Sequence, residues 1–311
     1  MFAHWTIALV FCSLLAQVAT AQQQVVDPDF KPAVASPAYA SGGPVVAIDE
    51  AHQNFHTATG NYRPFAELLR ADGYRVRAST SKLSAETFKG VDIFVVVNAE
   101  GTFAGAEADA LRDWVKAGGS LLLTADHEPF GAAMESLGLR FGVSMGKGRA
   151  YDSEVPGRIT TQLTYSRANG LLGEHPILEG RNASERVNLV KTFTGQSLGL
   201  PQGASPLLRF GATAREAVTV AQLNQVGEAI ARNEVIAGGP PSVAGRVQGL
   251  AMPFGKGRIV VLGEAGMFSA QAVKFPPGSG QQDFKFGMNL PGTDDRQFAL
   301  NVLHWLSRVI G

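Results

Sequence analysis

The stretch Ser120-Leu-Leu-Leu-Thr-Ala-Asp-His-Glu-Pro-Phe-Gly131 decides the fold that the sequence predicts. Its apolar run, Leu121 to Leu123, follows two glycines and is typical of a strand buried on both faces of a parallel sheet. Three ionisable residues, Asp126, His127 and Glu128, stand where the strand gives way to a turn. Ligands of open α/β sheets bind beyond the carboxyl ends of the strands, so this triplet is the first candidate for a functional site.

Strands and helices alternate before this stretch. Compact apolar or alternating runs predict strands over 44–48, 74–78 and 92–97. Helical spacing predicts helices near 62–69 and 106–116, with a short one over 84–88. This alternation with short connections predicts a parallel sheet with right-handed crossovers.

The second half of the chain is less regular. Residues 142–170 are rich in Gly, Ser, Thr and Arg and predict a long loop or a small insertion, and residues 216–243 predict a poorly ordered excursion; the sequence leaves open whether either acts as a lid. Short strands are expected near 187–190 and 206–210, a hairpin over 250–262, and a closing helix over 293–306.

The N-terminus predicts export. The apolar segment from Trp5 to Ala19 is too short to span a bilayer comfortably and ends in Ala19-Thr-Ala21, a small-x-small pattern that signal peptidases cleave. We therefore expect a signal peptide over 1–21, a flexible Pro- and Ala-containing linker over 22–43, and one domain over 44–311. The mature protein is expected to be periplasmic or secreted, without membrane insertion after cleavage.

Cysteine use and charge exclude several classes of function. Cys12 is the only cysteine and lies in the predicted signal peptide, so the mature chain would have no disulfide, no thiolate metal site and no cysteine nucleophile. The 27 acidic and 27 basic residues balance, and no basic stripe suggests a nucleic-acid partner.

The order of the elements resembles the class I glutamine-amidotransferase-like superfamily. The resemblance rests on five features in combination, namely the strand Val45–Ile48, the strand and turn Leu121–Glu128, His175-Pro-Ile177, the hairpin Gly255–Val261 and the closing helix Arg296–Leu306. It is closest to exported bacterial branches of unknown function and more distant from the trehalose-utilisation type. It implies an α/β, flavodoxin-like three-layer sandwich with a mostly parallel central sheet and a C-terminal hairpin plus helix.

One departure from that superfamily bears on function. Its amidotransferases carry a cysteine nucleophile at the turn that corresponds to Asp126-His127-Glu128, and this chain has no cysteine there or later. Glutamine hydrolysis through a thioester is therefore excluded, and a fold alone assigns no activity.

Two polar clusters are candidates for chemistry. Asp49, Glu50, His52 and His56 follow the first strand; histidines four apart share one face if the segment is helical, and with carboxylates they suit zinc or a similar divalent ion. The alternative is that Asp49 caps the turn and His52 hydrogen-bonds the loop backbone. Because the segment lacks the H-E-x-x-H order, it is not a metalloprotease motif.

The second cluster is Asp126, His127 and Glu128, which either function in a site or cap the following helix. If the first and fourth parallel strands are neighbours, both clusters face one crevice. Glu264, two residues beyond a later apolar strand, is expected to add an acid to the same rim or to cap local N–H groups. Asn289 and Arg296 either bind an anionic or hydroxylated ligand or tie down their loop.

These observations support two main hypotheses. The first is an exported, metal-assisted, hydrolase-like enzyme acting on a small polar or carbohydrate-derived substrate. Asp49, His52, His56 and Asp126 would hold a zinc-like divalent ion, and Glu50, His127, Glu128 and Glu264 would supply catalytic groups. The second is a non-catalytic ligand- or partner-binding module on an amidotransferase scaffold that has lost its nucleophile. A purely structural envelope protein is a third hypothesis.

Overall fold

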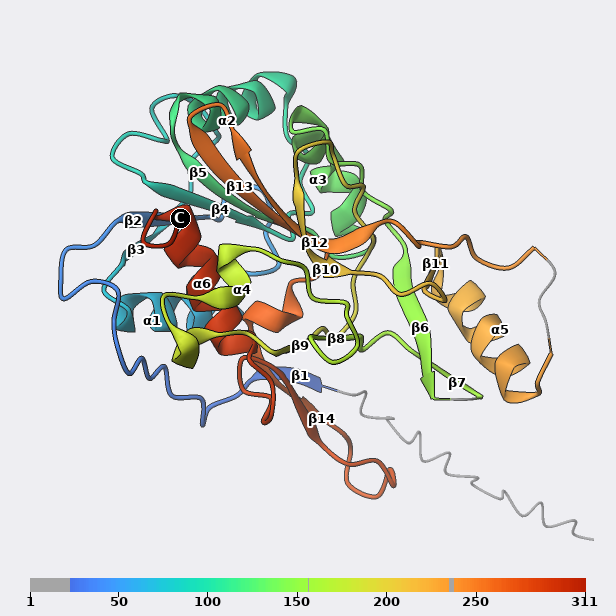
Figure 1. Ribbon diagram of the computed structural model, residues 1–311. Helices are drawn as coiled ribbons and strands as arrows, with labels where there is room; N and C mark the ends of the chain where they lie inside the picture. The colour runs from blue at the N-terminus through green and yellow to red at the C-terminus, as the bar shows by residue number, and fades with distance from the viewer. Residues whose placement is uncertain (1–22, 156, 235–237) are drawn as a thin grey trace, which may run out of the picture.

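A computed structural model describes residues 23–155, 157–234 and 238–311 (Figure 1). Its centre is a seven-stranded sheet in the order β10-β12-β13-β5-β4-β2-β3. Three smaller sheets, in the orders β1-β14-β15, β11-β6-β7 and β8-β9, lie around it. The predicted signal peptide, 1–21, lies outside the described residues.

The elements of the central sheet and its helices account for most of the first half and the end of the chain. The strands of this sheet are β2 (Val45–Asp49), β3 (Arg75–Ser79), β4 (Ile93–Val97), β5 (Ser120–Thr124), β10 (Ser205–Arg209), β12 (Val247–Phe254) and β13 (Gly257–Leu262). The helices against it are α1 (Arg63–Ala71), α2 (Gly105–Ala117), α3 (Phe130–Arg140), α4 (Pro176–Glu179) and α6 (Asp295–Leu306).

The remaining elements come from the N-terminus and the second half. They are β1 (Gln23–Val26), β6 (Arg149–Val155), β7 (Arg158–Thr160), β8 (Thr164–Ser166), β9 (Leu189–Lys191), β11 (Arg215–Ala217), β14 (Ala270–Lys274), β15 (Phe284–Gly287), the helix α5 (Val220–Ala231) and the 3-10 turns η1 (Ala183–Glu185) and η2 (Gly266–Phe268).

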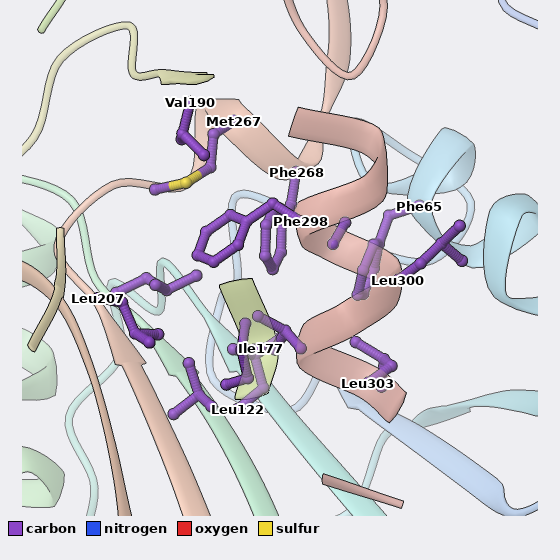
Figure 2. Close-up of a cluster of buried hydrophobic side chains, with 14 of the residues drawn as sticks. Phe65, Leu122, Ile177, Val190, Leu207, Met267, Phe268, Phe298, Leu300 and Leu303 are labelled. Atoms are coloured by element: carbon purple, nitrogen blue, oxygen red, sulfur yellow. The ribbon is translucent and has the colours of Figure 1, made fainter. Parts of the chain in front are cut away.

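Strand β5 is buried at every position because both faces of the sheet are covered. Side chains alternate along a strand, so Leu121 and Leu123 enter the core beneath α2 and α3, whereas Leu122 enters the core beneath α1 and α6. Figure 2 shows this second core, in which Leu122 lies among Phe65 of α1, Phe298 of α6 and their neighbours.

The predicted fold class is wrong: the molecule is not a flavodoxin-like three-layer sandwich with a mostly parallel sheet. Parallel pairing is confined to the run β13-β5-β4-β2-β3. The central sheet becomes antiparallel at β12 and β10, and each of the three smaller sheets is antiparallel throughout. The described chain is therefore a mixed, largely antiparallel β protein with a minority of helix, and the apolar runs of the first half did not reveal the antiparallel half.

The predicted adjacency of the first and fourth parallel strands is also wrong. Strand β4 pairs with both β2 and β5 and separates them. The other neighbour of β5 is β13, which comes more than 130 residues later in the chain and returns parallel to it. This order moves the Asp49 loop away from Asp126 and brings Glu264 next to it.

Two segments predicted as irregular are partly regular. Residues 142–170 contain β6, β7 and β8, and residues 216–243 contain the last part of β11 and all of α5, while 235–237 lie outside the described residues. In Figure 1 α5 and the β11-β6-β7 sheet stand beside the central sheet. The short helix expected over 84–88 is a series of turns.

The segment predicted as a flexible linker is partly structured. Strand β1 pairs antiparallel with β14, and both Asp27 and Phe30 are buried. Further along, the ring of Tyr39 packs edge-on against Tyr74 at 5.1 Å. No helix in the described residues is both long and apolar enough to cross a bilayer.

Candidate functional site

Asp126 and Glu264 occupy equivalent positions on neighbouring strands. Thr124 at the end of β5 is paired in register with Leu262 at the end of β13, and each acid follows two residues later. Because the strands are parallel, both carboxyl groups lie at the same edge of the sheet. The sequence suggested Glu264 as one possible member of this rim, but not which strand it would adjoin.

Both carboxyls are buried. Asp126 is 7 % exposed and Glu264 is fully buried. Burial raises the pKa of Asp126, against the opposing effect of His127 and of the backbone N–H groups of His127 and Ala265. Burial and the charge of Asp126 raise the pKa of Glu264 well above its ordinary value. Burial and mutual repulsion thus act in the same direction on the pair, toward the protonated form.

Tyr62 and His56 complete the buried side of this site. The hydroxyl of Tyr62 donates to the carbonyl of Ala265 at 2.8 Å, and the ring of His56 packs on the Tyr62 ring at 4.6 Å. Burial and the charges of Glu264 and Asp126 raise the pKa of Tyr62. Burial lowers the pKa of His56 to about 3, so His56 is neutral at physiological pH.

The exposed side of the site carries His127 and two aromatic rings. Nδ1 of His127 donates to the carbonyl oxygen of Glu128 at 2.8 Å, and its Nε2 lies 3.8 Å from Oδ1 of Asp126. Phe55 is 50 % exposed, and its ring lies 5.8 Å from that of Phe130. The site thus combines a partly exposed imidazole, buried acids and an exposed aromatic surface.

Asp49 and His52 lie elsewhere, on the face of the sheet that α2 covers. Nδ1 of His52 donates to Asp49 at 2.9 Å, and Nε2 donates to Glu107 of α2 at 3.0 Å. The His52 ring packs on Phe103 at 4.1 Å. Burial opposes protonation of His52, but the two carboxylates outweigh it and raise its pKa. Both ring nitrogens are therefore used within the fold.

The predicted metal-ligand set does not assemble. Residues 51–56 form bends and an isolated bridge rather than a helix, so the two histidines share no helix face. His52 packs with the core beneath α2, and His56 packs with Tyr62 in the core beneath α1. In the described residues no three His, Cys, Asp or Glu side chains are grouped to hold a metal ion. Of the four predicted ligands, Asp126 belongs to the acid pair, His56 packs on Tyr62 beside it, and Asp49 and His52 lie elsewhere.

Of the three glutamates predicted as catalytic, Glu128 and Glu264 lie at this edge and Glu50 does not. Oε1 of Glu50 accepts the N–H of Ala58 at 2.8 Å, so this side chain fastens its own loop. Glu128 is half-buried beside His127, and its N–H donates to the carbonyl of Lys147 at 2.9 Å. Glu264 also caps local N–H groups, as the alternative prediction expected. Its two carboxylate oxygens accept the N–H groups of Gly266 and Met267 at 2.7 and 2.8 Å.

Sequence reasoning missed three residues that position the site. Asn98, the first residue after β4, adopts a left-handed φ of 41° and its Oδ1 accepts the N–H of Asp126 at 2.8 Å. Gln196 donates to the carbonyls of Ala125 and Asp126 at 2.8 and 2.9 Å. The sequence could have indicated Asn98, because it is a polar residue directly after a buried strand. The helical spacing around Tyr62 predicted only a core residue, and no pattern in the sequence distinguishes Gln196.

The chain belongs to a family of unknown function. A family model described as "Domain of unknown function (DUF4350)" matches residues 54–278, which is most of the chain. No curated protein matches it. The family, rather than the class I glutamine-amidotransferase-like superfamily, is where this chain belongs, and that predicted resemblance is wrong.

Solved structures support a shared fold only. A structure named "mmIFT52 N-terminal domain" superposes with a TM-score of 0.58 at 12 % identity, covering 85 % of this chain and 97 % of that one. A cytoplasmic protein from Salmonella typhimurium gives a TM-score of 0.43 at 13 % identity, covering 85 % and 98 %. A putative ThuA-like protein from Bacteroides uniformis gives 0.41 at 11 % identity, covering 88 % and 93 %. The last two scores are too low to support an argument about this chain.

Neither the family nor these structures support the expected assignment as a metal-binding hydrolase. The acid pair at the ends of β5 and β13 is therefore the main candidate for function in this chain.

Proposed function

We propose that the chain is an exported enzyme that binds a small polar, carbohydrate-derived ligand at the carboxyl ends of β5 and β13, and that Asp126 exchanges a proton with this ligand. The observation that carries the proposal is the burial of Asp126 beside Glu264 at equivalent positions of two parallel strands. Burying two acids side by side is costly, because neither neutralises the charge of the other. Such perturbed pairs concentrate at functional sites.

The proposed roles follow from position and exposure. Asp126 is the acid that a ligand reaches, since its side chain retains 10 % exposure, whereas Glu264 lies behind it and raises the tendency of the pair to hold a proton. His127, whose side chain is 15 % exposed, would hydrogen-bond a ligand hydroxyl through Nε2. Phe55 offers an exposed ring on which the C–H face of a sugar can pack.

A second candidate is a non-catalytic ligand- or partner-binding module at the same edge. It is favoured by the backbone hydrogen bonds of Glu264, whose two oxygens accept the N–H groups that begin η2. A glutamate engaged in this way has a structural reason to be buried. The two candidates share the binding surface and differ in whether Asp126 takes part in chemistry.

The test is ligand-observed NMR with glucose, galactose, N-acetylglucosamine and trehalose as probes, recorded over time to detect products. For the enzyme we expect binding and slow conversion of at least one probe. Asp126→Asn preserves size and should lower turnover by about 10²-fold or more while leaving the Kd nearly unchanged. Phe55→Ala should weaken binding.

Leu139→Ala is the matched control for Phe55→Ala, because Leu139 is an equally exposed apolar residue, at 55 %, on α3. Binding of a probe without turnover would contradict the proposed enzyme and support the non-catalytic binding module. Failure of all four probes to bind, or equal effects of Phe55→Ala and Leu139→Ala, would reject the proposed carbohydrate site.

A further inference from the structure

A second site lies at the start of α6. The loop 288–293, the first turn of α6 and Ser184 of η1 line an open cavity of about 440 Å³. This volume is of the size that small-molecule sites occupy. Its polar lining is supplied by Ser184, Asn289, Thr293, Asp294, Arg296 and Gln297.

Arg296 brings a cation without a partner to this cavity. Its guanidinium lies over the ring of Phe30, 4.8 Å from the ring centre, and the residue is half-buried. Arg296 forms no ion pair within the described part of the chain. Burial lowers the pKa of its guanidinium. A cation in the first turn of a helix also opposes the helix dipole, so α6 gains nothing from Arg296 at this position.

The acids around the cavity are committed to other groups. Asp27 forms an ion pair with Lys285 at 2.6 Å. Oδ2 of Asp294 accepts the N–H groups of Asn188 and Leu189 at 2.7 and 3.0 Å. A charged group that is half-buried and left without an opposite charge is costly to the fold. Neither carboxylate forms an ion pair with the guanidinium.

Asn289 also lines this cavity, and the protein encloses its amide oxygen, which the described residues leave unpaired. Its Nδ2 donates to Asp27 at 2.9 Å and to the carbonyl of Gln271 at 3.1 Å, which fixes the orientation of the amide. Its buried Oδ1 has no hydrogen-bond partner among the described residues. A buried acceptor left unpaired is costly unless a ligand or water satisfies it.

We propose that this cavity binds a small hydroxycarboxylate such as a sugar acid. A planar carboxylate matches the two-pronged donor geometry of the Arg296 guanidinium, which lies over the Phe30 ring. Ligand hydroxyls can donate to the hydroxyl and amide oxygens of Ser184, Thr293 and Gln297 in the lining. The cavity that these groups line has room for one ring. This site is separate from the acid pair and does not depend on the function proposed for it.

The experiment is isothermal titration of the full mature chain with glucuronate, galacturonate and gluconate, with glucose as the neutral probe. We expect at least one acid to bind, with an affinity that falls as salt rises, and glucose to leave this site empty. Arg296→Gln should weaken binding of the acid at least about tenfold. Arg209→Gln, which removes an exposed arginine of β10, is the matched control and should leave it unchanged.

Four results would overturn the proposal. The first is that none of the three acids binds the wild-type chain, and the second is that Arg296→Gln binds them as well as Arg209→Gln does. A third is a large fall in Tm for Arg296→Gln without ligand, because this would give Arg296 a structural role. The fourth concerns the other site. His127→Ala must leave binding of the acid intact, and loss of binding in that variant would place the acid at the ends of β5 and β13 instead.

Discussion

Buried histidines at the strand ends differ in charge according to what faces them. His52 lies between Asp49 and Glu107, and these two carboxylates raise its pKa against the opposing effect of burial. His56 faces the Tyr62 ring, its Nδ1 has no partner among the described residues, and its pKa is about 3. The two rings, four residues apart in the sequence, therefore have opposite effects as pH falls. Protonation of His52 is favoured in the folded state, and protonation of His56 is disfavoured there.

His56→Phe should make the protein more resistant to acid. The folded pKa of about 3 lies below the unfolded value near 6.5, so the unfolded chain takes up a proton first. The free energy of unfolding therefore decreases as pH falls from about 6.5 toward about 3, and the loss due to His56 is on the order of 2 kcal/mol at pH 4.5. Phenylalanine keeps the stack on Tyr62 and removes the titration. Urea denaturation at pH 7 and 4.5 measures it, and an equal loss of stability in both proteins would contradict the interpretation.

Asp295 has the opposite dependence on pH. Burial raises its pKa to about 8, against hydrogen bonds from the N–H of Lys191 and the hydroxyl of Thr293. The folded chain therefore holds a proton that the unfolded chain has released between about pH 4 and pH 8. The stability that this proton provides is complete below pH 4 and is lost as pH rises to 8.

Asp295→Asn should stabilise the protein at alkaline pH. The amide keeps an acceptor for Lys191 and cannot ionise. The folded pKa of about 8 lies far above the ordinary value of 3.8, so at pH 8 the variant is expected to exceed the wild type by about 5 kcal/mol. At pH 4 the two proteins should be nearly equal. Urea denaturation across pH 4 to 8 gives both comparisons, and a constant difference over that range would show that Asp295 does not titrate in the window.

At the scale of elements, the turn from β5 to α3 is shaped by a residue from far along the chain. Gln196 is fully buried and donates to the carbonyls of Ala125 and Asp126. Its Oε1 accepts the N–H of Lys147 at 2.7 Å. Three backbone groups of two loops thus depend on one amide, and the position of Asp126 depends on it too.

Gln196→Ala should destabilise the protein by roughly 2–3 kcal/mol, because it leaves three buried backbone groups without their partner. Gln282→Ala, in the exposed loop between β14 and β15, is the control and should stay within about 0.5 kcal/mol of wild type. Urea denaturation measures both. Equal stabilities of the two variants would mean that water replaces the amide at the turn.

The sequence predicted elements better than their arrangement. Strands β2, β4 and β5 were predicted because burial on both faces leaves a continuous apolar run. Their order could not be predicted, since a strand's apolar run does not identify its neighbour. Segment 216–243 shows a second limit: α5 buries only Val226 and Ala229, so its apolar stripe is too narrow to reveal a helix.

The candidate site illustrates the same limit. Asp126 and His127 were found because they follow a recognisable strand. The pairing of Asp126 with Glu264 depends on β13 lying beside β5, and the separation of His52 from Asp126 depends on β4 lying between β2 and β5. Individual site residues were therefore predictable, whereas their grouping was a property of the sheet.

At the scale of the whole molecule, the N-terminal segment links parts that are distant in sequence. In Figure 1 it runs from β1, beside β14, past α1 to β2. Arg181, from the loop after α4, donates to the carbonyl of Ser36. Asp72, directly after α1, accepts the N–H of Ala38 at 2.7 Å through Oδ1 and the Nε2–H of His304 in α6 at 2.7 Å through Oδ2. One buried carboxyl group therefore joins this segment, α1 and α6.

Asp72→Ala should destabilise the whole domain by roughly 3 kcal/mol, since it leaves His304 buried without a partner and frees the N–H of Ala38. Asp113→Ala removes an exposed acid that pairs with Arg112 and should change stability by less than about 0.5 kcal/mol.

Hydrogen exchange separates a local from a global effect of Asp72→Ala. If Asp72 joins the N-terminal segment to the core, the amide of Ala38 should lose protection by a larger factor than the amides of β5, which report global unfolding. Asp72→Asn retains an oxygen that can accept from Ala38 and should recover part of that protection. A uniform loss of protection at Ala38 and β5 would mean that the segment opens only when the domain unfolds, and that the contact with His304 alone accounts for the stability.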